Sequence, residues 1–175
     1  NALHWMAISV YNGFFSLHTK ALGLASDVPG DAMGIAILGE AAAFWFAPRL
    51  FQRYGSAPWV VAAILISALR WWLTAHTEDG ATIVWLQLLH FFSFGVWYAA
   101  AIDRLGVFAG PEHRATYQGV FSAGVLSLGA IVGFLGGGWL LDVAGGAVLF
   151  RVAAGCDLLA AGVALAAWRV WARPG

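Results

Sequence analysis

Residues 115–141 read ATYQGVFSAGVLSLGAIVGFLGGGWLL and contain no Asp, Glu, Lys, Arg or His. The stretch exceeds the roughly 20 apolar residues with which a helix crosses about 30 Å of hydrocarbon. A strand of a membrane β-barrel would instead alternate apolar and polar residues at every second position. Residues 115–141 therefore predict a membrane-spanning helix.

The rest of the chain has the same apolar character. Of its 175 residues, 61% are hydrophobic and 10% are charged, and the mean hydropathy is +0.78. This composition leaves too little polar surface to coat a water-soluble globule. The formal net charge is zero and no basic run is interleaved with aromatic residues, unlike in nucleic-acid-binding proteins. We therefore expect the surface of the chain to contact a lipid bilayer, and we expect no binding of nucleic acid.

Glycines, prolines and charge clusters divide the chain into apolar segments. We expect an all-α bundle of six membrane-spanning helices at about 1–24, 31–48, 57–75, 81–102, 115–141 and 146–168. The chain opens at Asn1 directly in an apolar segment, with no initiator Met and no basic leader region. We interpret residues 1–175 as one transmembrane domain of a protein whose N-terminal part is missing from this sequence.

The charged residues of loops and chain ends separate by sign between the two sides of the predicted membrane. One side collects the basic residues Arg49, Arg53, Arg104, Arg114, Arg169 and Arg173. The opposite side collects Lys20, Asp27, Asp31, Glu78, Asp79 and Asp142. Because Lys and Arg accumulate in short cytoplasmic loops, we expect the arginine side and both chain ends to be cytoplasmic. The pattern predicts a multi-pass protein of the cell (inner or plasma) membrane.

Several short motifs stand at defined places between and within these spans. In chain order they are Phe46-Ala47-Pro48-Arg49 with Arg53-Tyr54-Gly55, Ala68-Leu69-Arg70-Trp71, Leu88-Leu89-His90, Arg114-Ala115-x-x-Gln118-Gly119 and Asp142-x-x-Gly145. Their order and spacing resemble the C-terminal half of the lactose-permease-like branch of the major facilitator superfamily, which includes sugar and phenylpropionate permeases. The resemblance covers essentially the whole chain. It implies helices seven to twelve of a twelve-helix transporter, built as two inverted three-helix repeats, with the N-terminal half of the same transporter as partner.

Glu40 lies near the middle of the second expected span, beside Gly39 and Ala41. An ionised carboxylate at that depth costs several kcal/mol unless it is paired or protonated. We therefore consider two roles for Glu40, a structural ion pair with Arg70 and a substrate-binding or proton-binding site. In similar permeases, a glutamate about one helical turn from this position binds substrate.

Arg70 and His90 are the other ionisable residues at depth in the middle spans. Arg70 is predicted either to snorkel to the membrane interface or to pair with Glu40 or with a substrate carboxylate. His90 is either a hydrogen-bonded structural residue or a group that switches its charge when a negative partner arrives. The resemblance places Arg70 in a proton-coupling network, but the proton-carrying glutamate of that pattern is Ser93 here. We therefore expect Glu40, or a residue of the missing part, to carry the proton.

The first and fourth expected helices are predicted to face a central cleft. We expect Asn12, His90, Phe94 and Trp97 to point into it together. Asn12 is interpreted either as a hydrogen-bonding residue of the cleft wall or as a contact between helices. Asp157 is the intramembrane acid of the last span, and the sequence identifies no partner for it.

Glycines recur at every fourth position in the fifth expected span, as Gly129, Gly133 and Gly137. Such spacing makes one face of a helix smooth enough for another backbone to approach closely. We expect this face to pack on protein rather than to bind substrate.

Motifs of enzymes and metal sites are not found in the sequence. Cys156 is the single cysteine, and His4 and His18 are spread over about 20 Å of helix, so a metal site is not expected. GxSxG, HExxH and the glycine-rich phosphate loop are missing. We therefore expect no catalysis, no metal and no cofactor.

The sequence as a whole favours a secondary active transporter. Without an ATP-binding motif, we expect an ion gradient to drive it, with proton symport as the favoured coupling and alternating access as the mechanism. The resemblance suggests a small organic solute such as an aromatic acid, a sugar or a nucleoside. The candidate substrate-binding or coupling residues are Glu40, Arg70, His90, Asn12 and Trp97. The alternative is a non-transporting polytopic protein, such as a receptor or assembly subunit; an intramembrane enzyme is a more remote one.

Overall fold

A computed structural model describes the backbone of residues 1–171 and the side chains of residues 1–168. Every described element is helical. In order they are α1 Ala2–Ala21, α2 Val28–Tyr54, α3 Ala57–His76, α4 Gly80–Leu86, η1 Gln87–Leu89, η2 Phe91–Val96, α5 Trp97–Val120, η3 Phe121–Ser127 and α6 Leu128–Trp171. Element η1 is a 3₁₀ helix, and η2 and η3 are π-helices. The Arg169 side chain and all of Arg173, which the sequence predicts on the basic side, lie outside the described residues.

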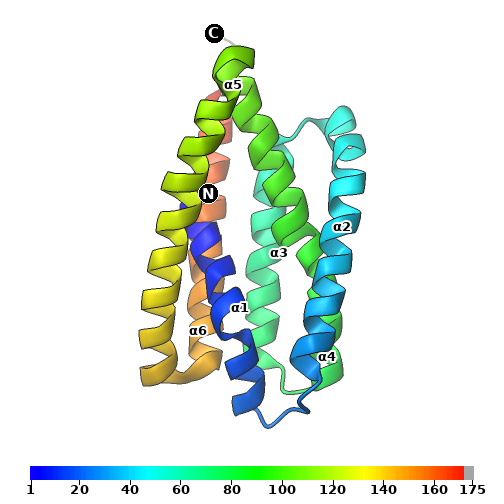
Figure 1. The fold of residues 1–175 in the computed structure, drawn as a ribbon, viewed down its shortest axis with the longest axis vertical. Coiled ribbons are helices and arrows are strands. Elements are labelled where there is room, and N and C mark those ends of the chain that lie inside the picture. The colour runs from blue at the N-terminus through cyan, green and yellow to red at the C-terminus, as the bar shows by residue number, and fades with distance from the viewer. Residues whose placement is uncertain (172–175) are drawn as a thin grey trace.

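The long helices α5 and α6 each turn back at a glycine. Gly110 in α5 has φ 67° and Gly145 in α6 has φ 79°, a left-handed conformation that glycine adopts without the steric cost of a Cβ. Figure 1 shows the chain reversing its direction at both places. The run from Gly80 to Trp168 is one of three helical runs that are long and apolar enough to span a membrane, with Val28–Tyr54 and Ala57–His76.

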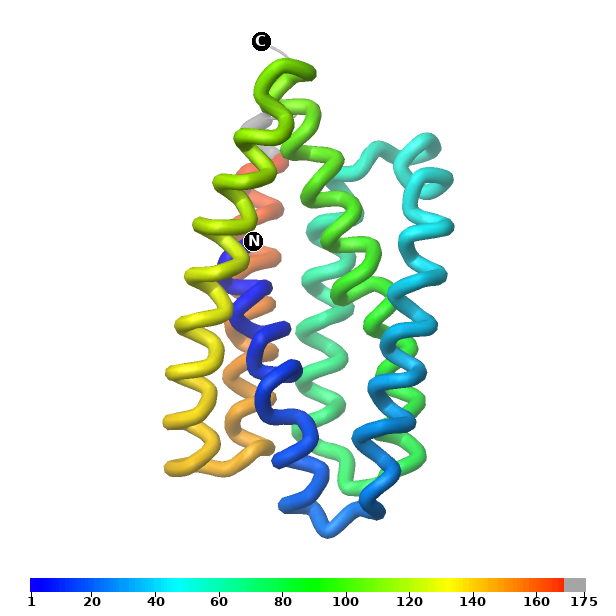
Figure 2. The backbone as a smooth tube through the Cα atoms, viewed as in Figure 1, coloured from blue at the N-terminus to red at the C-terminus, as the bar shows by residue number. Residues whose placement is uncertain are grey.

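The connections between helices gather at the two opposite ends of an elongated bundle (Figure 2). One end holds the α1–α2 and α3–α4 connections and the turn at Gly145, and the other holds the α2–α3 connection and the turn at Gly110 (Figure 1). The helices between these ends present large apolar side chains outward, with exposed fractions of 69% for Leu38, 70% for Trp45 and 73% for Leu135. A surface of this kind suits contact with lipid and would be a liability in water.

Helix α2 is longer than the span 31–48 that the sequence predicts, because it continues through Pro48 to Tyr54. Proline removes one backbone hydrogen bond, but membrane helices tolerate it where neighbouring groups satisfy the freed carbonyl. The helical backbone therefore carries Arg49 and Arg53 beyond the predicted end of the span.

The core lies where α6 packs along α1 and α3. It includes Ile8 and Tyr11 of α1, Ile64 and Trp71 of α3 and Phe150 of α6, all at most 2% exposed. The glycine face of α6 contributes to this packing. A Cβ added at Gly133 would lie 2.6 Å from the Met6 carbonyl oxygen, and one at Gly129 would lie 3.0 Å from the Ala2 carbonyl oxygen. The prediction that this face packs on protein is confirmed.

Helix α6 offers a matched test of the close approach, because a Cβ at Gly136 meets nothing within 4 Å. Gly133→Ala should lower the free energy of unfolding by about 1–3 kcal/mol, since the methyl group collides with α1. Gly136→Ala should be neutral or stabilising by up to about 1 kcal/mol. Thermal unfolding of the two variants in detergent measures the difference. Equal midpoints would contradict the close packing.

Helix α4 begins outside the membrane-spanning segments with a side-chain cap. Asp79 Oδ2 accepts hydrogen bonds from the Thr82 backbone N–H at 2.7 Å and from the Thr82 hydroxyl at 2.6 Å. The hydroxyl first, and the backbone N–H second, lower the pKa of Asp79. The cap therefore stabilises the folded state while Asp79 is ionised.

Asp79→Ala should lower the unfolding midpoint at neutral pH by removing this cap. Because the pKa of Asp79 is lower in the folded state, its contribution is complete above the ordinary aspartate range and is lost as the pH falls through the lowered pKa. The midpoints of Asp79→Ala and of the unchanged protein should therefore converge in acid. Glu78→Ala, at the neighbouring exposed position, serves as the control, and a gap of constant size across pH would be evidence against the ionised cap.

Candidate functional site

Arg70 of α3 lies at the centre of a buried polar cluster. Its side chain has 0% exposure. Nη1 donates to His90 Nδ1 at 2.8 Å and to Ser93 Oγ at 2.9 Å, and Nη2 donates to Gln87 Oε1. Arg70 is therefore bonded to the irregular segment of η1 and η2, and it does not snorkel to the interface.

Two aromatic rings complete the surroundings of the guanidinium. Its Cζ lies 4.3 Å from the ring centroid of Tyr11 on α1 and 4.4 Å from that of Trp71. Aromatic faces attract a cation, and the attraction grows when water is excluded. The charge of Arg70 is thus stabilised by hydrogen bonds on one side and by π-systems on the other.

The partner of His90 decides which ring nitrogen carries the hydrogen. A guanidinium only donates, so His90 Nδ1 must accept and Nε2 must be the protonated nitrogen. Nε2 faces Glu40 Oε2 at 3.8 Å, and the Glu40 side chain is 31% exposed. Of the two roles considered for Glu40, the direct ion pair with Arg70 is not formed, because the imidazole of His90 lies between the two side chains.

Glycines allow α2 to approach η2 closely enough for this contact. A Cβ at Gly39 would lie 3.3 Å from the backbone nitrogen of Phe91, and a Cβ at Gly95 would collide with the Ala43 side chain. Gly39 directly precedes Glu40 in the chain. The close packing of the two backbones thus sets the distance between Glu40 and His90.

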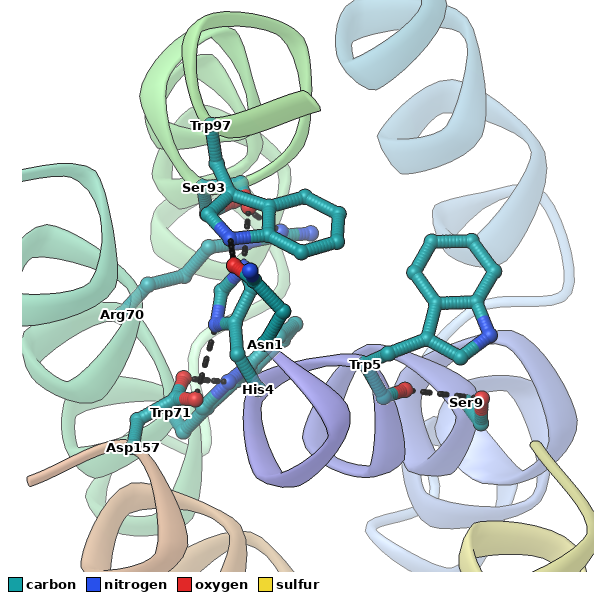
Figure 3. Close-up of polar contacts among 9 residues, drawn as sticks. All are labelled: Asn1, His4, Trp5, Ser9, Arg70, Trp71, Ser93, Trp97 and Asp157. Carbon is teal, nitrogen blue, oxygen red and sulfur yellow. Dashed lines mark hydrogen bonds and ion pairs between the residues drawn. The ribbon is translucent and has the colours of Figure 1, made fainter. Parts of the chain in front are cut away.

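A second buried cluster involves Asp157 of α6, which has 0% exposure. Asp157 Oδ1 lies 2.8 Å from His4 Nδ1, and Oδ2 accepts from Trp71 Nε1 at 2.9 Å. His4 Nε2 lies 2.8 Å from the backbone oxygen of Ser93. Figure 3 shows the His4 ring between Ser93 and Asp157. Ser93 joins the two clusters, since its hydroxyl accepts from Arg70 and its carbonyl faces His4.

Sequence reasoning missed the pairing of His4 with Asp157. The signal available was that each is an ionisable residue inside an otherwise apolar segment, which requires a partner. Nothing in the sequence indicates that these two residues, which are 153 positions apart on α1 and α6, are partners.

The four side chains predicted to point into one cleft have different surroundings in the structure. His90 and Phe94 do lie together, with stacked rings whose centroids are 5.3 Å apart. Trp97 is instead completely buried, with its ring 4.5 Å from that of His4, and Asn12 is exposed on α1. The π-helix η2 turns the chain less per residue than an α-helix, so it rotates Trp97 away from the face of His90.

A separate cavity of about 640 Å³ opens between α2 and α5. Its wall includes Phe44, Phe51 and Tyr98, together with the polar residues Arg114, Asp103 and Gln52. Glu40, Arg70, His90, Asn12 and Trp97 do not line it. Within the described residues, no group of three or more His, Cys, Asp or Glu is placed to hold a metal ion.

An all-helical bundle with an apolar exterior and ionisable groups in its interior defines a polytopic membrane protein. A family model described as "MFS_1 like family" matches residues 2–152. The chain therefore belongs to this family of the major facilitator superfamily.

A curated relative from Escherichia coli (strain K12) carries the name "Probable 3-phenylpropionic acid transporter". It is 23% identical over 133 residues, which cover 74% of this chain and 35% of the relative. The chain thus spans about a third of the length of that protein. No solved structure matches the chain.

The role of the two terminal guanidinium nitrogens of Arg70 can be tested with a charge-conserving substitution. Arg70→Lys keeps the charge, but a single ammonium group cannot reach His90, Ser93 and Gln87 together. We expect the free energy of unfolding to fall by about 2–4 kcal/mol, because buried acceptors lose their donors. Arg49→Lys on the exposed surface is the control and should be neutral. Unfolding in detergent measures both, and similar stability of the two variants would contradict the assignment.

Proposed function

We propose that the chain is the C-terminal half of a secondary active transporter that moves a small organic solute together with protons. In this proposal, its six transmembrane helices form two inverted three-helix repeats, and its partner is the N-terminal half of the same transporter. The family membership and the transporter relative support it. The separation of basic and acidic loops supports a cell inner (plasma) membrane location with both ends of the segment cytoplasmic.

The observation that carries the proposal is the chain of contacts from Glu40 through His90 to Arg70. His90 cannot accept a proton at Nδ1 without losing its bond to Arg70. Glu40 is the acid of this cluster, and its partly exposed carboxylate can exchange a proton with water. We therefore assign the proton-carrying role to Glu40 and a positioning role to His90 and Arg70.

The remaining candidate residues have different roles in this proposal. Trp97 packs against His4 and donates from Nε1 to Asn1 Oδ1 at 3.1 Å, so it supports the buried clusters. Asn12 presents its amide on the exposed side of α1, where a solute or the N-terminal half can bond to it.

Among the solutes that the sequence suggests, the cavity between α2 and α5 favours an aromatic acid. Phe44 and Tyr98 lie edge to face with centroids 6.3 Å apart, and Arg114 supplies a cation at the same cavity wall. The wall also holds the carboxylate of Asp103, which accepts a hydrogen bond from the Ser56 hydroxyl. Aromatic rings and a guanidinium are the groups that recognise an aromatic carboxylate. 3-Phenylpropionate is therefore the first solute to use as a probe.

Glu40→Gln in the full-length transporter, reconstituted in proteoliposomes, tests the coupling. Accumulation of labelled 3-phenylpropionate against its gradient should fall to the equilibrium level, because the amide cannot carry a proton. Counterflow should persist, since exchange needs no net proton release. Glu78→Gln, at an exposed position outside the spans, is the control and should leave both activities intact.

Two outcomes would contradict this account. Full uphill accumulation by Glu40→Gln would exclude Glu40 as the proton carrier. Absence of counterflow by the unchanged protein with an aromatic acid, a sugar and a nucleoside would favour a non-transporting membrane protein.

A further inference from the structure

The ring of His4 lies between two hydrogen-bond acceptors. The backbone oxygen of Ser93, 2.8 Å from Nε2, only accepts, so Nε2 carries a hydrogen. The contact of 2.8 Å between Nδ1 and Asp157 Oδ1 needs a second hydrogen, on the ring or on the carboxyl group, because two lone pairs at that distance repel. The His4–Asp157 pair therefore holds one proton more than a neutral histidine beside a carboxylate.

The surroundings favour retention of this proton. Both side chains have 0% exposure, and Trp71 Nε1 donates to the other oxygen of Asp157. With its proton the pair has no net charge, and without it the pair is a buried anion in the membrane interior, which is costly. His4 is on α1 and Asp157 is on α6, so the pair opens only if these helices separate at this level.

The backbone of η2 is shaped to provide the second acceptor. The Trp97 N–H bonds to the carbonyls of Phe92 and Phe94, on either side of the Ser93 carbonyl. The Ser93 oxygen faces His4 instead. A π-helical turn thus contributes directly to the site, as such turns often do at functional positions.

Other titratable groups face the pair from the elements around it. Asp157 interacts electrostatically with Arg70 on α3 and with Cys156 on α6, and His4 interacts with His90. The hydrogen bonds of the pair go to the Ser93 carbonyl and to the Trp71 indole, and neither of these groups is titratable.

The charges of the whole cluster link the pair to Glu40. Arg70 is permanently positive. When the His4–Asp157 pair is protonated it has no net charge, and an ionised Glu40 balances the charge of Arg70. When Glu40 is protonated, the charge of Arg70 is balanced only if the pair has lost its proton and become an anion. Arg70 lies between the two sites and does not relay protons, so each site exchanges its proton separately.

We propose that the His4–Asp157 pair is a proton-binding site in addition to Glu40, and that the coupling proton occupies one of the two sites at a time. The first part stands on the geometry of the pair. The second part rests on the proposed transport function.

Thermal unfolding of the full-length protein in detergent, between about pH 7 and about pH 9, tests the first part. In the unfolded chain the two side chains are separate, and a free histidine is already neutral in this range. Unfolding therefore releases the extra proton of the pair, and the folding equilibrium weakens by up to about tenfold per pH unit as the pH rises. Asp157→Asn supplies an amide donor to Nδ1 and removes the extra proton. The decline of the midpoint with pH should therefore be much smaller in this variant.

Trp71→Phe is the matched control, because it removes the other hydrogen bond of Asp157 but keeps the proton. Its midpoint should be lower than that of the unchanged protein and should decline equally with pH. If Asp157→Asn does not fold, the double variant His4→Gln with Asp157→Asn replaces the pair by two amides and should show the same small decline. Equal declines in the unchanged protein and in the variant without the carboxylate would overturn the proton site.

Transport of 3-phenylpropionate in proteoliposomes tests the second part. Asp157→Asn should lose uphill accumulation and keep counterflow, which is also the result expected of Glu40→Gln, because Arg70 would then keep Glu40 ionised. Full uphill accumulation by Asp157→Asn would overturn the sharing of one proton. A pH-dependent difference in unfolding without counterflow in the unchanged protein would support the proton site and contradict the transport function instead.

Discussion

A buried guanidinium is the constraint around which the interior of this bundle is organised. Arg70 has 0% exposure, so its charge must be stabilised within the protein. Its two terminal nitrogens donate hydrogen bonds, while its buried Nε has no hydrogen-bond partner among the described residues. The partners come from Gln87 on η1, from His90 and from Ser93 on η2, and the Tyr11 ring of α1 covers the charge. One positive charge thus holds η1, η2 and α1 in a defined arrangement. Apolar packing alone would allow several arrangements, because it is not directional.

The position of Glu40 relative to the Arg70 charge depends on how closely the helices pack, and glycines allow that close packing. Gly39 and Gly95 let α2 approach η2, which brings Glu40 to the far side of the His90 ring. Gly133 lets α6 approach α1. Helices in lipid lack a strong hydrophobic drive to associate, so close backbone contact contributes much of their packing energy.

Irregular backbone within the fourth apolar segment changes what its side chains and carbonyls can do. The sequence from His90 to Trp97 has no proline and only one glycine, Gly95, so it does not predict a break from a regular α-helix. Gly95 lies at the contact with α2. In the structure η2 frees the Ser93 carbonyl for His4 and turns Trp97 into the core. The same turn thereby connects the Arg70 cluster with Asp157, and it separates residues that a regular helix would place on one face.

The sequence by itself determined the membrane class, the helical architecture and the presence of ionisable residues at depth, because hydropathy and span length are local properties of the chain. It also identified Glu40, Arg70 and His90 as intramembrane ionisable residues that require a partner or a function. Only the tertiary structure decided that His90 separates Glu40 from Arg70 and that His4 pairs with Asp157. Partners across helices depend on the rotation and depth of each helix relative to its neighbours. These follow from close packing and backbone irregularity, which no local pattern in the chain encodes.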